Sequence, residues 1–326
     1  MKRLRFGVVG CGAIVTLHQL PALRRSPEVE VVGVTDLDGA WAARVARRFG
    51  VPAAYTDHRA LLDRVDAVLV ATPNATHAEI ACAFLERGVH VLCEKPLATT
   101  RADVERMYAA ADRGGAQLVA GHCLRFSPNL ALLARVVAQG WLGEVERVTA
   151  AIGAPYDAGA QRTDFRRQRG LAGGGVLIDL GVHVLDLAVW YAGAPPEVTG
   201  FAAHAAPGWE VESDAEVTLA LGGRARAEVA ASFTQMLANT FTVRGREGWA
   251  RASLYVPTQL TLFAERARVC ARAGLQDLVL PGVSMYDAQL AHFCRVVRDG
   301  EAPLVTRSQV LATIDTIERC YARAAA

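Results

Sequence analysis

Hydrophobic positions in the first 122 residues alternate between short apolar runs and longer amphipathic stretches. The apolar runs lie at 4–10, 29–36, 65–72, 89–96 and 116–122. Helical spacing of apolar residues occurs over 13–25, 39–49, 74–87 and 100–113. Apolar strands separated by helices are typical of a parallel sheet that is covered on both faces. We therefore predict an α/β domain with a doubly wound sheet over residues 1–122.

The pattern changes after residue 122. Helical spacing is found over 127–139, 175–192, 285–298 and 307–323, with an irregular Gly- and Arg-rich segment at 140–174. Apolar and polar residues alternate, or nearly so, over 216–223, 224–235, 239–254 and 258–273. Such alternation is expected of antiparallel strands with one covered face. Residues 123–326 are thus predicted to form an α+β domain with a large, open, mainly antiparallel sheet.

The composition indicates a globular protein and argues against several functions. The chain has 326 residues, of which 52% are hydrophobic and 21% charged, so it has the apolar surface that folding requires. Its 35 basic and 33 acidic residues nearly balance, which argues against a nucleic-acid partner. The seven cysteines include no CxxC pair and are expected to be reduced thiols.

No membrane partner is expected either. The apolar stretch 176–193 contains three ionisable residues, which would be costly in hydrocarbon. The beginning of the sequence lacks the pattern of a signal peptide. We therefore predict a cytoplasmic location.

A glycine-rich turn follows the first apolar run. Gly10 permits a tight turn, and Gly12 allows a pyrophosphate to approach backbone N–H groups where the next helix begins. Val15 stands where the full dinucleotide fingerprint has a small residue. Taken alone, the motif also fits a turn that binds no ligand. The predicted cofactor contacts in this turn are Gly10, Cys11, Gly12, Ala13 and Ile14.

An acidic residue, Asp36, ends the second apolar run. A carboxylate there accepts hydrogen bonds from the adenosine ribose hydroxyls and repels the 2′-phosphate of NADP. No arginine directly follows Asp36, so NAD is predicted as the cofactor in preference to NADP, within a Rossmann-type domain. Asp36 can at the same time be the N-cap of the next helix.

Polar residues also follow the third and fourth apolar runs. The segments ATPNATH (71–77) and CEKP (93–96) fall at the carboxyl ends of strands, where ligands bind in parallel sheets. Outside this setting, Lys95 would be interpreted as a surface lysine and His77 as a helix residue with satisfied hydrogen bonds. The residues predicted to contact the cofactor here are Thr72, Asn74, His77, Glu94 and Lys95.

The segment GGGVLIDLGVHVLD (173–186) carries the strongest group of chemical residues. A glycine run begins a helix on which Asp179, His183 and Asp186 share one face at 100° per residue. A solvent-exposed polar face is the simpler alternative, but the helix is otherwise apolar, so these groups need partners or a cleft. Metal binding is a further alternative, and we predict no metal because no third set of ligands lies nearby.

Together these motifs resemble the glucose-fructose oxidoreductase and inositol dehydrogenase (Gfo/Idh/MocA) family of NAD(P)-dependent oxidoreductases. The resemblance covers nearly the whole chain, and its Lys-Pro and Asp-x-Gly-x-His elements are more specific than the glycine turn. It implies that Lys95 contacts the reacting hydroxyl and the nicotinamide ribose, that His183 is the general base and that Asp179 binds substrate. It also places Arg125 and Arg166 at the mouth of the cleft as substrate-binding residues.

The function predicted on this basis is hydride transfer between NAD and a hydroxyl-bearing carbon of a sugar, cyclitol or nucleotide-linked sugar. The basic run that includes Arg162 and Arg166 leaves room for an anionic substrate. Two alternatives remain open: cleavage of a glycosidic bond, or elimination, through transient oxidation by retained NAD, and a nicotinamide-binding regulator without turnover. Because the second sheet has an uncovered face, a homodimer or homotetramer is expected to form through it.

Overall fold

Six parallel strands form the first sheet in the computed structural model of the protein, which describes residues 2–160, 162–193, 195–265 and 273–324. Their order is β3-β2-β1-β4-β5-β6. The strands are β1 (Leu4–Val9), β2 (Val29–Thr35), β3 (Ala54–Tyr55), β4 (Ala67–Val70), β5 (His90–Glu94) and β6 (Leu118–Gly121). The predicted doubly wound sheet is confirmed, with the short edge strand β3 as an addition.

Helices cover both faces of this sheet, as its apolar strands require. One core cluster contains side chains of α1 (Leu20–Arg25) and α2 (Gly39–Phe49), and the other contains side chains of α3 (His77–Leu85) and α4 (Arg101–Gly114). The second of these clusters continues without a break into the core beneath the second sheet. The two domains therefore share apolar packing.

Eight strands form the second sheet, in the order β14-β13-β12-β11-β7-β10-β9-β8. The strands are β7 (Val145–Gly153), β8 (Glu197–His204), β9 (Asp214–Ala220), β10 (Arg226–Ser232), β11 (Thr240–Gly245), β12 (Gly248–Ser253), β13 (Gln259–Ala264) and β14 (Gly274–Val279). Neighbours pair antiparallel except β7 and β10, which are parallel. The predicted open, mainly antiparallel sheet is confirmed.

The structure corrects the prediction for the segment 140–174. That segment was expected to be irregular, but it contains β7, which lies in the interior of the sheet. The inward side chains of β7 are Val148, Ala150 and Ile152, and they alternate with Arg147, Thr149 and Ala151 on the outer face. Strands β8 and β14 were not predicted. Part of the predicted strand 258–273 lies outside the described residues.

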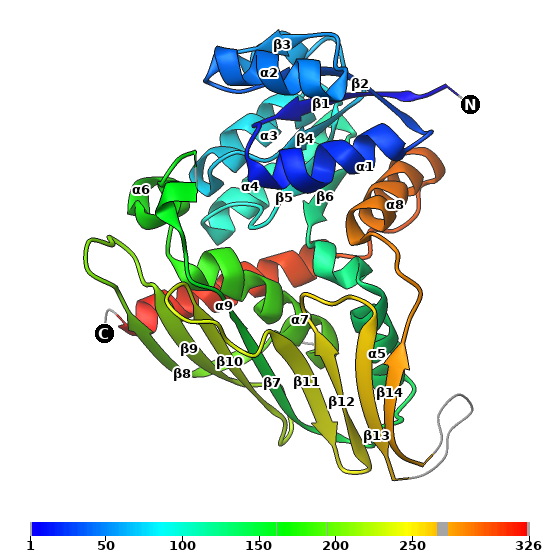
Figure 1. Ribbon diagram of the computed structural model, residues 1–326, viewed down its shortest axis with the longest axis vertical. Coiled ribbons are helices and arrows are strands. Elements are labelled where there is room, and N and C mark those ends of the chain that lie inside the picture. Colours follow the sequence, from blue (N-terminus) through cyan, green and yellow to red (C-terminus); the bar gives the residue numbers. More distant parts are fainter. Residues whose placement is uncertain (1, 161, 194, 266–272, 325–326) are drawn as a thin grey trace.

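In the part of the chain that the structure describes, helices lie on one face of the second sheet, the face turned toward the first domain (Figure 1). They are α5 (Pro128–Ala138), α7 (Val182–Ala192) and α9 (Arg307–Ala324). The segment Arg169–Ala192 is long and apolar enough to cross a membrane, but 83% of its apolar window is buried inside the fold. We therefore interpret it as a core helix.

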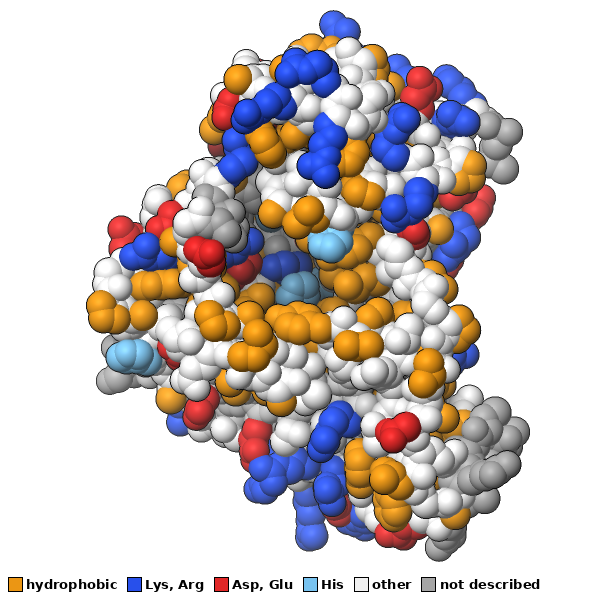
Figure 2. Space-filling model, viewed as in Figure 1, with side chains coloured by type: hydrophobic (Ala, Val, Ile, Leu, Met, Phe, Trp, Pro, Cys, Tyr) orange, Lys and Arg blue, Asp and Glu red, His pale blue; other side chains and the backbone are white. Residues whose placement is uncertain are grey.

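One late helix packs back onto the first domain. Helix α8 (Met285–Asp299) follows the second sheet in the chain, yet it lies against α1 and the first sheet. Its Phe293 contacts Phe6 of β1 edge to face, with ring centroids 5.7 Å apart. Between the two halves the surface is hollowed, and Lys or Arg and His side chains are visible at the floor of this cleft (Figure 2).

Candidate active site

The glycine turn has the shape that a bound pyrophosphate requires. Gly10 has φ +93°, and a Cβ on it would lie 2.2 Å from the carbonyl oxygen of Ala71. A Cβ on Gly12, by contrast, would meet nothing within 4 Å. Gly10 is therefore required by the turn itself, whereas Gly12 leaves open space next to the start of the helix. Of the remaining predicted contacts, Cys11 is buried, Ala13 is exposed and Ile14 is half-buried.

Asp36 is held at the end of β2 by three hydrogen bonds. Its Oδ2 accepts from the backbone N–H of Cys11 (3.0 Å), and its Oδ1 accepts from the N–H of Asp38 (3.0 Å). The third bond comes from Arg162, 3.1 Å away and contributed by the second domain. The helix N-cap proves to be Asp38, which accepts from the N–H of Trp41, and not Asp36.

The side chains of Asn74 and His77, which follow β4, connect neighbouring segments of the protein. The ring nitrogens of His77 each lie 2.8 Å from a backbone carbonyl, those of Pro96 and Thr72, so His77 links the loops that follow β4 and β5. Burial lowers the pKa of His77. Asn74 is buried, and its amide donates to the carbonyl of Ala172 in the second domain. These two side chains are thus occupied within the protein.

Glu94 ends β5 and Lys95 directly follows it, but the two side chains have different surroundings. Glu94 is buried and accepts a hydrogen bond from Gln19 at 2.7 Å, and burial raises its pKa. Lys95 is half-buried, and its Nζ donates to the carbonyl oxygen (2.7 Å) and to Oδ1 (3.1 Å) of Asp179. An ammonium has three N–H donors, so one remains for another acceptor.

Asp179 lies between two cations. Its Oδ2 accepts from Nε of Arg166 at 2.7 Å, while its Oδ1 faces Lys95. Burial alone raises the pKa of Asp179, but the charges and hydrogen bonds of Lys95 and Arg166 outweigh burial and hold the pKa below its ordinary value. The Lys95 ammonium at this point can stabilise negative charge that develops on a substrate oxygen.

His183 follows Asp179 by one turn and is half-buried. Its Nδ1 has no hydrogen-bond partner among the described residues. Burial lowers the pKa of His183 well below the ordinary value, and the Lys95 cation and the nearby His122 lower it further, while Asp179 opposes them. His183 is therefore neutral at pH 7 and able to accept a proton.

The helix that carries Asp179 and His183 begins in a tightly built turn. A carboxylate, that of Glu212, accepts from the backbone N–H groups of Gly175 (3.0 Å) and Leu177 (3.1 Å) and from the hydroxyl of Tyr321 (2.8 Å). A Cβ on Gly175 would lie 1.8 Å from the carbonyl oxygen of Glu212, and one on Gly174 would lie 2.1 Å from the hydroxyl of Tyr321. The glycine run is thus required by close packing.

A π-helical turn, Leu177–Gly181, follows this start and replaces the regular α-helix that the sequence predicts. Such turns are frequent at functional sites. Glu212 and the π-helical turn were both missed by the sequence analysis. Glu212 lies far along the chain from the glycines it binds, and the apolar spacing gives no sign of the extra residue in the turn.

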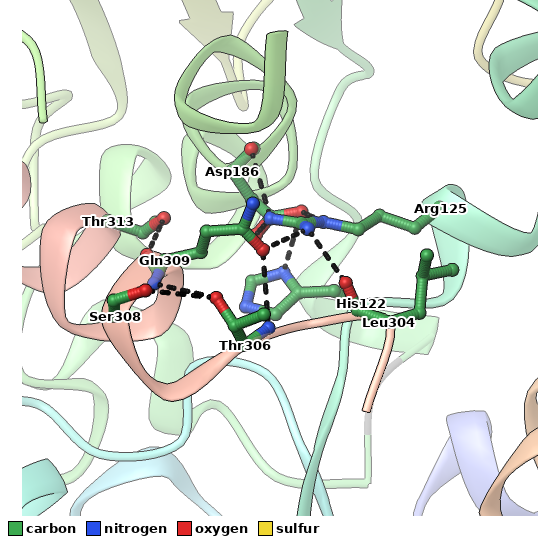
Figure 3. A network of polar contacts seen from close by, with 8 residues as sticks. All are labelled: His122, Arg125, Asp186, Leu304, Thr306, Ser308, Gln309 and Thr313. Atoms are coloured by element: carbon green, nitrogen blue, oxygen red, sulfur yellow. Dashed lines mark hydrogen bonds and ion pairs between the residues drawn. The ribbon is translucent and has the colours of Figure 1, made fainter. Parts of the chain in front are cut away.

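Asp186 does not join the other two residues in the cleft. It forms a bidentate ion pair with Arg125 (2.8 and 2.7 Å; Figure 3). Both side chains are buried. Arg125 also donates to Gln309 and lies over the ring of Trp190. The structure therefore places Arg125, which was predicted at the mouth of the cleft, inside the protein with 1% exposure.

The arginines of the basic run have separate partners. Arg166 lies in the site on Asp179, whereas Arg167 pairs with Asp164 and Arg169 donates to the carbonyl of Glu210. Only Arg166 of these three is bonded to a predicted catalytic residue. Among the described residues, no group of three or more His, Cys, Asp or Glu side chains is arranged to hold a metal ion.

The fold and the site together define a class. A Rossmann-type domain with an open glycine turn lies opposite a second domain, and a lysine, a carboxylate and a neutral histidine meet at their junction. This combination is that of a dinucleotide-dependent oxidoreductase.

Comparison with known families agrees with this class of protein. Residues 4–122 match the family described as "Oxidoreductase family, NAD-binding Rossmann fold", and residues 130–251 match the "GFO/IDH/MocA C-terminal domain". The chain therefore belongs to the GFO/IDH/MocA oxidoreductase family, as its motifs suggested.

Several of the similar proteins are named as sugar or nucleotide-sugar oxidoreductases. The chain is 30% identical to D-xylose 1-dehydrogenase (NADP(+)) 2 of Haloferax volcanii, over 98% of this chain and 96% of that protein. It is 32% identical to dTDP-3,4-didehydro-2,6-dideoxy-alpha-D-glucose 3-reductase of Saccharopolyspora spinosa, over 92% and 89%. The crystal structure of KijD10, a 3-ketoreductase from Actinomadura kijaniata in complex with NADP and TDP-benzene, superimposes with a TM-score of 0.88 at 26% identity, over 98% of each chain.

Proposed function

We propose that this protein transfers a hydride between NAD(H) and a secondary hydroxyl or ketone carbon of a sugar, cyclitol or nucleotide-linked sugar. The observation that carries the proposal is the junction of Lys95, Asp179 and His183 at the carboxyl edge of the first sheet. Sugar oxidoreductases among the similar proteins support the substrate class.

The residues of the site divide the chemistry among them. When bound, the nicotinamide accepts or supplies the hydride. In the oxidative direction, the remaining N–H of Lys95 donates to the reacting oxygen and stabilises its negative charge. His183 takes the hydroxyl proton on a ring nitrogen as the hydride leaves carbon, so that a carbonyl forms. Asp179, kept ionised by its two cations, accepts hydrogen bonds from neighbouring hydroxyls of the substrate.

NAD(H) is proposed as the preferred cofactor, since the Asp36 carboxylate favours ribose hydroxyls over a 2′-phosphate. The glycine turn fits a pyrophosphate, because the space next to Gly12 is open. One of the similar proteins is named for NADP(+) and another was crystallised with NADP. The ratio of the affinities for NAD(H) and NADP(H) is therefore the quantity to measure.

A substrate screen tests the function. Sugars, cyclitols and nucleotide-linked sugars are incubated with NAD⁺, and the reduced nicotinamide is followed by its absorbance. The expected result is stoichiometric formation of NADH with one chemical group of substrates. Turnover of a glycoside with no net NADH and a retained cofactor would instead favour cleavage through transient oxidation. Absence of any turnover with a bound cofactor would favour a regulator.

We further propose that two copies associate through the uncovered face of the second sheet. Trp249 and Phe263 stack there, with ring centroids 6.5 Å apart, and both are partly exposed. Sedimentation velocity is expected to show a dimer or tetramer, and a monomer at micromolar concentration would contradict this proposal.

The six described cysteines are free and buried, which supports the proposed cytoplasmic location.

A further inference from the structure

Arg162 connects the second domain to the loop that follows β2. Its Nη2 lies 3.1 Å from Oδ1 of Asp36, and its Nη1 lies 3.1 Å from Oδ2 of Asp38. The side chain is 35% exposed, so it is accessible from the cleft. One guanidinium thus spans both carboxylates at the place where the adenosine ribose of a dinucleotide binds.

The indole ring of Trp41 orients the Arg162 side chain. Trp41 donates from Nε1 to the carbonyl oxygen of Cys11 at 2.7 Å, so its ring is anchored to the glycine turn. Arg162 lies over that ring, 4.7 Å from its centroid, and Arg44 lies 4.8 Å from it. The stack orders the Arg162 guanidinium beside Asp36 and the glycine turn, with a second cation at the same ring.

The acidic and basic side chains around Asp36 have opposite effects on the binding of a 2′-phosphate. Asp36 and Asp38 together repel a 2′-phosphate, which carries negative charge at neutral pH. Arg162 neutralises part of that charge, and a planar guanidinium is suited to binding phosphate oxygens in pairs. The basic run was interpreted from the sequence as room for an anionic substrate, but Arg162 lies at the cofactor.

We propose that Arg162 is a specificity-determining residue that the second domain contributes to the cofactor site. It binds the 2′-phosphate of NADP(H) when that cofactor enters and so limits the preference for NAD(H) that Asp36 creates. Asp36 favours NAD(H) over NADP(H), whereas Arg162 favours NADP(H). The inference rests on the dinucleotide site and not on the identity of the sugar.

The test measures binding without any sugar substrate. Dissociation constants of ADP-ribose and 2′-phospho-ADP-ribose, and of NAD⁺ and NADP⁺, are determined by calorimetry for the full chain and for Arg162→Ala. Loss of a charge-assisted bond is expected to weaken binding of the two phosphorylated ligands about 10- to 100-fold. The dissociation constants of the ligands without the phosphate should change by less than about threefold, so the ratio of the phosphorylated to the unphosphorylated dissociation constant rises at least about threefold.

Arg169→Ala is the matched control. It removes the same charge from the same segment, but Arg169 is bonded to Glu210. It is expected to leave the ratio unchanged. Arg162→Lys, which keeps the charge but not the planar fork, should give an intermediate ratio. A melting temperature measured for each variant shows that the compared proteins are folded.

Two results would overturn the proposal. If Arg162→Ala weakens all four ligands equally, Arg162 only ties the two domains together. If no ligand changes, the contact with Asp36 and Asp38 has no bearing on the cofactor. Both outcomes leave the proposed sugar chemistry untouched, and a failed sugar screen would leave the ratio of dissociation constants untouched.

Discussion

Lys95 and Asp179 are 84 positions apart in the chain, yet the ammonium of one donates to both the carbonyl and the carboxylate of the other. Lys95 directly follows a strand of the first sheet, and Asp179 belongs to the helix that lies over the second sheet. The contact therefore fixes the two domains to each other at the point where hydride and proton transfer are proposed. A group held in this way needs little reorganisation when charge develops on a substrate oxygen.

The first prediction concerns the two groups proposed to act on the reacting oxygen. Lys95→Ala and His183→Ala are each expected to lower kcat by about 10²- to 10⁴-fold, the usual effect of removing a positioned acid or base. NAD⁺ affinity should change far less in His183→Ala, because the glycine turn and Asp36 belong to the other domain. Turnover, NAD⁺ affinity and melting temperature are measured on the same preparations.

The matched control for His183 is His204→Ala, an exposed histidine on β8. It should keep full turnover. If His183→Ala melts several degrees lower but its folded fraction turns over at the normal rate, His183 has a structural role and is not the base.

Much of this site could be predicted from the sequence, because its signals are local. The glycine turn, Asp36 and Lys95 all follow apolar runs, and the topology of a parallel sheet brings strand ends to one edge. What could not be predicted depends on contacts between distant segments. The partner of Arg125 and the role of Arg162 are examples, since neither a buried ion pair nor a bond between domains leaves a pattern in residue spacing. Strand β7 does carry an alternating pattern from Arg147 to Ile152, so this strand could have been predicted from the sequence.

The second prediction concerns cofactor choice. NAD(H) is expected to bind at least tenfold more tightly than NADP(H), a difference of about 1.4 kcal/mol. Asp36→Ala should narrow this preference, because it removes both the acceptor for the ribose hydroxyls and the repulsion of the 2′-phosphate. Calorimetric titration measures both affinities, with Asp63→Ala at an exposed surface pair as the control. Tighter binding of NADP(H) by the unaltered protein would contradict the assignment of Asp36.

The third prediction concerns the start of the catalytic helix. Glu212→Ala removes the acceptor of two backbone N–H groups and of the Tyr321 hydroxyl. Loss of such a cap is expected to lower the free energy of unfolding by about 1–2 kcal/mol. Because the helix carries Asp179 and His183, kcat should fall as well. Urea unfolding and turnover are compared with those of Glu210→Ala, whose carboxylate accepts from the N–H of Arg169 at the surface. Equal behaviour of the two variants would show that the cap is unimportant.

The fourth prediction distinguishes structure from substrate binding at Arg125. Asp186→Asn leaves the buried guanidinium without its counterion, which is expected to cost about 3–5 kcal/mol of the free energy of unfolding. Breaking the exposed Arg87–Asp63 pair should cost at most about 1 kcal/mol. Folded Asp186→Asn should keep a KM close to that of the unaltered protein. A large rise in KM with unchanged stability would return Arg125 to the substrate site.

The fifth prediction is a dependence of stability on pH that His183 helps to set. The pKa of His183 is lowered by burial, by Lys95 and by His122, and burial also lowers the pKa of His77 and His122. An unfolded chain has histidine pKa values of about 6.5, so below that pH the unfolded state binds protons that the native state does not. The contribution of these histidines to the free energy of unfolding should therefore be constant above about pH 7 and decrease as the pH falls through 6.5. Each such histidine contributes at most about 1.4 kcal/mol per pH unit.

His183→Asn removes one of these contributions, so its stability should decrease less steeply on the acid side, whereas exposed His204→Asn should follow the unaltered protein. Urea unfolding across this pH range measures the slopes. The same shift places the acid limb of kcat/KM below pH 6.5, because His183 must lose its proton before it can accept one from the substrate. An acid limb at or above 6.5 that is unchanged in Lys95→Ala would show that another group is the base. A limb that moves upward in Lys95→Ala is the expected result, since the variant removes a cation that lowers the pKa of His183.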